Sequence, residues 1–277
     1  MHGLRLRYRS AIIAAVLSVA VNASAQAPAD PKEAFKPTVG QAGKDVVWVP
    51  TPAALVEKML DMAKVTPQDY VMDLGSGDGR NIIAAARRGA TAVGVEFNPE
   101  MVELSRKEAQ AQGVADKATF IQGDMYEADI SKATVLALFL LPHNLNKLLP
   151  KFLALKPGTR IVGNTFAPEG WTADETETIA GDCVSWCTSL LWIVPAKVDG
   201  TWKMPQGELA LKQEFQMVSG SLTSSGSPGL VNGKLRGDLI TFTVGDTEYS
   251  GRVNGDRMEG TSKANGTNGT WTATRVR

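Results

Sequence analysis

Three glycines and two acids lie close together in the stretch VMDLGSGDGRN. Gly75, Gly77 and Gly79 alternate with other residues, and Asp73 and Asp78 stand before and among them. Glycine at a strand-to-helix turn lets a ligand approach the main chain without meeting a Cβ atom. The spacing differs from the Gly-x-Gly-x-x-Gly of dinucleotide loops, and no Gly-Lys-Ser/Thr follows, which excludes a P-loop. The pattern indicates a backbone-lined site for a small molecule.

The charge of the two acids narrows the class of ligand. Carboxylates at Asp73 and Asp78 would repel a pyrophosphate, whereas they suit a ligand that carries an ammonium or sulfonium group. The electrostatics therefore favour S-adenosylmethionine over a nicotinamide dinucleotide. Ser76 belongs to the same loop, and we include it in the predicted cofactor site.

Two further acids close the next two apolar runs. Glu96 ends TAVGVE, where an acid in doubly wound nucleotide sites accepts hydrogen bonds from ribose hydroxyls. Asp124 ends ATFIQGD, where a carboxylate can accept a bond from an adenine amino group. Taken alone, each acid could be a solvated strand end. Their register on successive strands favours one binding edge at the carboxyl ends of a parallel sheet.

Strand and helix patterns alternate over residues 47–198, and the strand patterns are nearly continuous apolar runs. Both features predict an α/β domain with a doubly wound, Rossmann-like sheet covered on its two faces. Thr51 followed by Pro52 predicts a helix N-cap and first turn, and Asn98 followed by Pro99 predicts another. The expected strands are 70–74, 91–96, 118–124, 134–142 and 160–166, with an antiparallel hairpin within 171–195.

The chain changes character over residues 200–277, where short alternating runs are separated by Gly, Asn, Asp and Ser. A weak repeat pairs NGKLRGDLITFT with SGRVNGDRMEGT, and Asn254-Gly255 is a hairpin turn signal. We predict a small antiparallel β domain, a meander or barrel, with Trp202 and Trp271 in its core. It could recognise a protein or envelope component through a face or edge, or simply pack on the α/β domain.

The first residues have the features of an export signal. Three arginines precede an apolar run that ends in Ala-Ser-Ala, which predicts a signal peptide at 1–25 and a periplasmic location. The run is about half of the roughly 20 residues that a membrane span needs, although an uncleaved anchor is the alternative. Residues 26–46 read as a flexible leader. We expect no stable membrane span after cleavage.

The chain carries 29 basic and 29 acidic residues. The signal peptide contains three arginines and no acid, so its removal leaves a mildly acidic protein, which disfavours a nucleic-acid binder. Cys183 and Cys187 could form a disulfide in an oxidising compartment, or remain two small buried thiols. These cysteines and His143 are too few to build a zinc site, so no metal is expected.

The quoted motifs resemble a known family. YVMDLGSGDGR, TAVGVEFNPEMVELSR and FIQGDMYEAD look like the cofactor motifs of class I, seven-strand, S-adenosylmethionine-dependent methyltransferases. WVPTP and FLLPHNLNKLLPKFLALKPGTRIVGNTF are similar to a narrower branch, which includes mitochondrial lysine methyltransferases that act on a component of ATP synthase. The resemblance implies that Thr51, Asp73, Gly75 and Gly77 surround the methionine end of the cofactor, with Glu96 at the ribose and Asp124 at the adenine.

The sequence identifies the methyl acceptor less directly than it identifies the cofactor. Transfer from a sulfonium is an in-line displacement that depends mainly on positioning and charge. The loops after the fourth and fifth strands should form the acceptor side, which makes His143, Asn144 and Asn164 candidates. His143 could instead be a surface residue, and Asn144 could be a helix N-cap. Phe166 could wall the acceptor channel or fill the core.

We therefore expect an exported methyltransferase whose acceptor is unidentified, protein lysine being one candidate. The alternatives are a methyltransferase for a small metabolite, and a non-catalytic protein that binds an adenosyl ligand while its β domain contacts the envelope. The cofactor is made in the cytosol. An exported enzyme therefore needs cofactor in the periplasm, or it acts before export, or its fold serves for binding. A hydrolase is disfavoured because no Gly-x-Ser-x-Gly sequence is present.

Overall fold

The computed structural model describes residues 35–181, 183–224 and 227–276. The predicted signal peptide and the first part of the predicted leader lie outside the described residues. Within the described segments, no helix combines the length and the apolar character that crossing a membrane requires.

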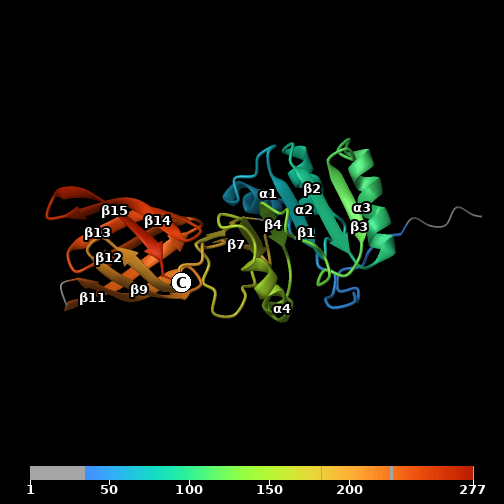
Figure 1. Cartoon of the computed structure of the whole chain (residues 1–277). Coiled ribbons are helices and arrows are strands. Elements are labelled where there is room, and N and C mark those ends of the chain that lie inside the picture. The colour runs from blue at the N-terminus through green and yellow to red at the C-terminus, as the bar shows by residue number, and fades with distance from the viewer. Residues whose placement is uncertain (1–34, 182, 225–226, 277) are drawn as a thin grey trace, which may run out of the picture. The chain divides into compact units, whose positions relative to one another are not determined.

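The α/β domain is built on one seven-stranded sheet with the strand order β3-β2-β1-β4-β5-β7-β6 (Figure 1). The first five strands in sequence are parallel, and β7 runs antiparallel between β5 and β6. This arrangement confirms the predicted Rossmann-like sheet, with a terminal hairpin formed by β6 and β7. The strands are β1 (Tyr70–Leu74), β2 (Thr91–Glu96), β3 (Ala118–Gln122), β4 (Val135–Leu138), β5 (Arg160–Asn164), β6 (Glu175–Thr178) and β7 (Thr188–Ile193).

Strands β3, β4 and β5 end earlier than the apolar runs predicted. As a result Asp124, Phe139 and Phe166 lie in loops at the carboxyl edge of the sheet. The strand order reverses between β1 and β4, where open α/β sheets bind their ligands. The chain after each parallel strand is therefore free to build a site at this edge.

Helices cover both faces of the sheet. They are α1 (Ala53–Met62), α2 (Arg80–Arg87), α3 (Pro99–Ala111) and α4 (Pro142–Phe152). Val71 of β1 packs in the apolar core with α1, α2 and α3, whereas Met72 and Leu74 pack in the core with α4. Side chains alternate along a strand, so Asp73 shares the face of Val71.

The helix starts differ in part from prediction. Asn98 caps α3, and its side chain accepts a hydrogen bond from the Glu100 N–H at 2.8 Å, as expected. The N-cap position of α1 is Pro52 and that of α4 is Leu141. Thr51 and Asn144 are therefore not the N-caps, and their side chains make other contacts described below.

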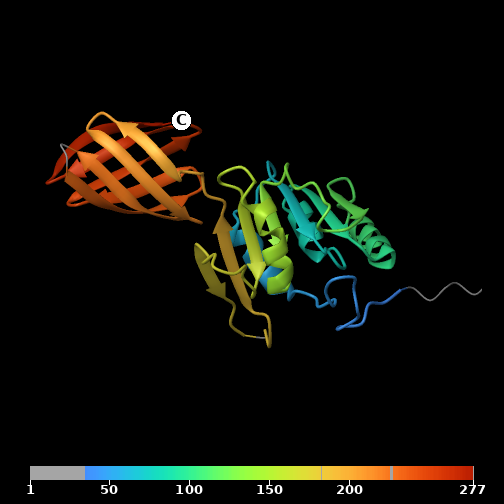
Figure 2. The ribbon, with the colours of Figure 1, turned by 60° about the horizontal axis from the view of Figure 1, so that its bottom comes forward.

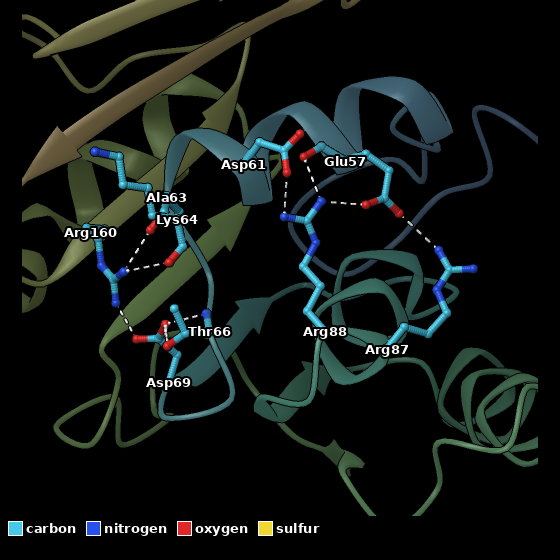
Figure 3. Close-up of polar contacts among 9 residues, drawn as sticks. All are labelled: Glu57, Asp61, Ala63, Lys64, Thr66, Asp69, Arg87, Arg88 and Arg160. Carbon is cyan, nitrogen blue, oxygen red and sulfur yellow. Dashed lines mark hydrogen bonds and ion pairs between the residues drawn. The ribbon is translucent and has the colours of Figure 1, made fainter.

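A polar network braces the amino edge of the sheet (Figure 3). Asp69, just before β1, pairs with Arg160 of β5 and accepts a hydrogen bond from the Thr66 N–H at 2.8 Å. Arg88, at the end of α2, contacts Glu57 and, at 2.7 Å, Asp61 of α1. These contacts fix α1, α2 and the central strands at the edge away from the glycine loop.

Strands β8 to β15 form a closed antiparallel barrel (Figure 2). The barrel closes where β15 pairs with β8. The strands are β8 (Gly200–Met204), β9 (Gly207–Glu214), β10 (Met217–Ser224), β11 (Ser227–Arg236), β12 (Leu239–Val244), β13 (Thr247–Asn254), β14 (Arg257–Ala264) and β15 (Thr267–Arg275). Trp202 and Trp271 are buried in its core, as predicted. The sequence repeat corresponds to two successive hairpins, because its Gly-Asp pairs connect β11 to β12 and β13 to β14.

Candidate functional site

One pocket opens at the carboxyl edge of the sheet, beside the ends of β1, β2 and β3. All eight predicted cofactor residues lie in its wall: Thr51, Asp73, Gly75, Ser76, Gly77, Asp78, Glu96 and Asp124. They come from distant parts of the sequence, and the parallel strands bring them to one edge. The structure thus assembles the residues in one place, while their contacts with a cofactor stay a prediction.

The glycine loop needs glycine for two separate reasons. Gly75 and Gly77 have φ of +76° and +54°, the left-handed region that other residues seldom adopt. A Cβ atom at Gly77 would lie 2.8 Å from the Trp48 indole nitrogen. The Gly75 N–H donates to the Val95 carbonyl at 2.8 Å, which ties the loop to the end of β2.

Glu96 is held by the backbone on both sides. One carboxylate oxygen accepts from the Gly77 N–H and the other from the Asn98 N–H, each at 2.9 Å. A carboxylate oxygen can accept more than one hydrogen bond. Glu96 is therefore oriented at the end of β2 and keeps acceptor capacity for the hydroxyls of a bound ligand.

Asp73 is the most perturbed acid of the pocket. It is 3% exposed, and one oxygen accepts from the Asn81 side-chain amide at 3.0 Å. The other oxygen has no hydrogen-bond partner among the described residues. Burial raises the pKa of Asp73 to about 8 against the effect of the Asn81 bond, and the negative charges of Glu96 and Asp78 raise it further. A cationic ligand would compensate this carboxylate.

These observations fit S-adenosylmethionine. The loop leaves its main chain bare, and Asp73 has a buried oxygen without a partner. The Ser76 hydroxyl is likewise buried and without a partner within the described part of the chain. A ligand with hydroxyls, amines and a positive charge would satisfy these groups.

A segment before α1 forms another wall of the pocket. Gln41–Pro50 line it, although the sequence placed residues up to 46 in the leader. Lys44 forms an ion pair with Asp124, and this bond, together with the Tyr126 N–H, holds the pKa of Asp124 below its usual range. The Lys44 ammonium also lies 5.1 Å from the centre of the Phe97 ring. The sequence around Lys44 contains no local pattern that predicts its long-range contact with Asp124.

Sequence analysis also missed Arg80 and Asn81 at the start of α2. Arg80 forms an ion pair with Asp78 and donates to the Thr51 carbonyl at 2.7 Å. Asp78 is thus already compensated by a cation, which leaves Asp73 as the acid open to a charged ligand. Both residues directly follow the glycine loop in GDGRN, and that adjacency was the available signal.

The three acceptor candidates are not in the pocket wall. His143 is exposed on α4. Asn144 is fully buried, and its side-chain amide donates to the Tyr126 hydroxyl at 2.7 Å. Asn164 is also buried, where its amide lies 3.3 Å from the Thr51 hydroxyl. Asn164 contacts Thr51 of the pocket wall and can position it, whereas Asn144 contacts Tyr126, which follows the wall residue Met125.

Comparisons with known proteins agree with this geometry. Residues 73–175 match the family described as the ANTKMT methyltransferase domain. This match ends before β8, the first strand of the barrel. A protein-lysine N-methyltransferase of Saccharolobus islandicus is 45% identical over 133 residues, which cover 47% of this chain and 83% of that protein. The lysine N-methyltransferase of Mus musculus that is named for the ATP synthase c-subunit is 35% identical over 130 residues, which cover 47% of this chain. The match spans about half, 52%, of the mouse protein.

Among solved structures, an RNA methyltransferase from Salinibacter ruber was determined in complex with S-adenosyl-L-homocysteine. It is 45% identical and gives a TM-score of 0.51, and the match covers 54% of this chain and 96% of that one. The shared part corresponds in extent to the α/β domain rather than to the whole chain.

Proposed function

This chain belongs to the class I S-adenosylmethionine-dependent methyltransferases, with S-adenosylmethionine as its cofactor, and from this premise we propose that it methylates lysine side chains of proteins. The observation that carries the proposal is the 45% identity to the protein-lysine N-methyltransferase of Saccharolobus islandicus over 83% of that protein. The lysine methyltransferase of Mus musculus supports the same acceptor class.

The geometry is consistent with transfer to an amine. The cofactor supplies an electrophilic methyl group on a sulfonium. Asp73 offers an oxygen without a partner to the positive charge of the cofactor, and Glu96 keeps acceptor capacity for its hydroxyls. A lysine amine has an ordinary pKa of about 10.4 and must lose its proton before attack. Bulk water at the open edge of the sheet can take that proton, so the reaction requires no dedicated base.

We also propose that the enzyme is exported. The predicted signal peptide at 1–25 supports this location. Cys183 and Cys187 are joined by a disulfide, as the first of the two sequence alternatives predicted. Disulfides persist in oxidising compartments such as the periplasm, so the bridge is a second, independent support.

The test begins with calorimetric titration of the mature chain, from Gln26, with S-adenosylmethionine and S-adenosylhomocysteine. Methyl-labelled cofactor is then incubated with the enzyme and four acceptor pools: periplasmic and membrane proteins, the same proteins with their lysines blocked by acetylation, total RNA, and a metabolite extract. We expect label in the unblocked proteins alone, recovered as methyl-lysine after hydrolysis.

Other results would separate the alternatives. Label in RNA would assign the acceptor class named for the Salinibacter ruber protein. Label in small molecules added as a metabolite extract would indicate a metabolite enzyme. Cofactor binding without transfer to any pool would contradict the lysine proposal and favour a protein that only binds an adenosyl ligand.

A further inference from the structure

Three aromatic side chains gather at the margin of the cofactor pocket. The ring centres of Phe139 and Phe166 are 6.2 Å apart, and the Trp186 ring lies 6.0 Å from the first and 5.3 Å from the second. Phe139 follows β4 and lines the pocket together with Asp73 and Thr51. The cluster therefore begins in the pocket wall and continues outward from it.

The cluster is not simply an extension of the core. Trp186 is 39% exposed, and Phe139 and Phe166 are only partly buried. Phe166 packs against the core on the side of α4, which supports the inner part of the cluster. Exposed aromatic residues on loops beside a binding pocket are typical of recognition rather than of packing.

The backbone adopts unusual conformations to present these rings. Thr165 and Trp186 have φ of +61° and +60°. A β-branched residue such as threonine is rare in this region, and such conformations concentrate at binding sites. The Thr165 hydroxyl donates to the Asn164 side chain at 2.9 Å, and its N–H donates to the Thr188 carbonyl at 2.8 Å. The loop after β5 is thereby tied to the start of β7.

A disulfide holds the third ring in place. Cys183 and Cys187 close a short loop that carries Trp186, and the second cysteine directly precedes β7. The bridge restricts the conformations that this surface loop can adopt. Its neighbour in the loop, Val184, is 97% exposed and contributes nothing to the cluster.

We propose that Phe139, Phe166 and Trp186 form the binding surface for the alkylammonium group of the acceptor, and that the Cys183–Cys187 disulfide positions Trp186 for this contact. The proposal rests on the proposed function and deepens it, because it names the group that recognises the acceptor. Aromatic faces attract ammonium groups, and clusters of such rings also recognise quaternary ammonium groups such as that of methyl-lysine. The same rings also contact the apolar stem of a lysine side chain.

The test measures binding and does not depend on methyl transfer. With S-adenosylhomocysteine bound, the probes are N-acetyl-trimethyllysine amide and its neutral isostere, in which carbon replaces the ammonium nitrogen. We expect the charged probe to bind about tenfold more tightly. Trp186→Ala should remove this preference and Trp186→Phe should retain part of it. Val184→Ala, in the same loop, should leave it unchanged.

The role of the disulfide is tested in the same assay and in transfer kinetics with a lysine peptide. Reduction by dithiothreitol should weaken binding of the charged probe and raise KM with little effect on kcat. A Cys183→Ser, Cys187→Ser variant should show the weakened values with or without the reductant. Affinity for S-adenosylhomocysteine should not change in any of these arms.

The outcomes separate the two proposals. Equal binding of the charged and neutral probes would overturn the ammonium site, even if the enzyme methylates lysine. A charge preference that survives Trp186→Ala would also overturn it, because the site would then lie elsewhere. Failure of the proposed function would appear instead as a lack of label in lysine, whatever the probes show.

Discussion

We expect Asp73 to lower the stability of the free protein and to strengthen the binding of a cationic ligand. Replacing Asp73 by asparagine tests both effects. Its carboxyl group is buried beneath the pocket, where burial raises its pKa to about 8. In the unfolded chain the same group has a pKa near 3.8. Between these two values folding must either keep the proton on Asp73 or bury its charge. The contribution of Asp73 to stability is therefore complete below about pH 4 and is lost progressively as the pH rises towards 8.

The size of this effect follows from the interval between the two pKa values. At pH 7 the interval above 3.8 is about three pH units, and each is equivalent to about 1.4 kcal/mol. The burial of Asp73 therefore costs the free protein about 4 kcal/mol at pH 7. Asp73→Asn abolishes this titration, while its side-chain oxygen can still accept the bond from Asn81. We expect the variant to be more stable than the wild type by up to about 4 kcal/mol.

Urea unfolding of both proteins at pH 4, 5.5, 7 and 8 measures the effect. The stability gain of Asp73→Asn should be near zero at pH 4 and should grow towards pH 8. Affinity for S-adenosylmethionine should fall by about 1–3 kcal/mol, because the ligand loses its charged partner.

Asp69, at the other end of β1, provides a matched control (Figure 3). Burial opposes the ionisation of Asp69, but hydrogen bonds from Thr134 and Thr66 and the charge of Arg160 outweigh it and lower its pKa. Asp69→Asn should therefore destabilise the protein at pH 7, and the loss should shrink as the pH falls through the folded pKa. Equal effects of the two substitutions, or a pH-independent gain for Asp73→Asn, would refute the reasoning.

The remaining predictions concern the rest of the pocket and the disulfide. Glu96→Ala should weaken cofactor binding by about 1–3 kcal/mol by calorimetry, and unchanged affinity in a folded variant would remove Glu96 from the site. Gly77→Ala should lower the free energy of unfolding by about 1–2 kcal/mol, because residue 77 has a left-handed backbone. The added Cβ should also displace Trp48 and so change the tryptophan emission. Wild-type emission and stability would contradict the crowding at this position. Thiol titration of the denatured, non-reduced protein should find no reactive thiol at Cys183 or Cys187, and two would end the disulfide assignment.

The cofactor-binding residues could be predicted from the sequence because they lie at or near the ends of strands. Asp73, Glu96 and Asp124 each follow an apolar run, and parallel strands place such positions at one edge whatever the details of packing. Thr51 could be placed there only through family resemblance. The local pattern assigned it to a helix cap, yet the helix begins at Ala53 and the Thr51 hydroxyl instead lies near Asn164.

The pocket and aromatic-cluster residues that lie in loops could not be predicted in this way. Its surfaces come from loops, and their positions depend on contacts between residues far apart in sequence. Lys44 pairs with Asp124, which lies 80 positions later in the sequence. Trp186 meets Phe139 and Phe166 from a loop that a disulfide closes, and its own backbone is left-handed. Apolar periodicity describes strands and helices, and it carries no information about such contacts.

The charges of the pocket now explain which acid a cationic ligand should meet. Asp78 is paired with Arg80, Asp124 with Lys44, and Glu96 is satisfied by two backbone N–H groups. Asp73 accepts from the amide of Asn81, and no cation contacts it among the residues that the structure describes. Burial makes the ionised form of Asp73 costly and keeps its proton on at neutral pH in the free protein, whereas a cationic ligand stabilises the ionised form and releases that proton. The preference for a sulfonium or ammonium ligand is thus located at the end of β1, and the neighbouring acids mainly hold the loops that surround it.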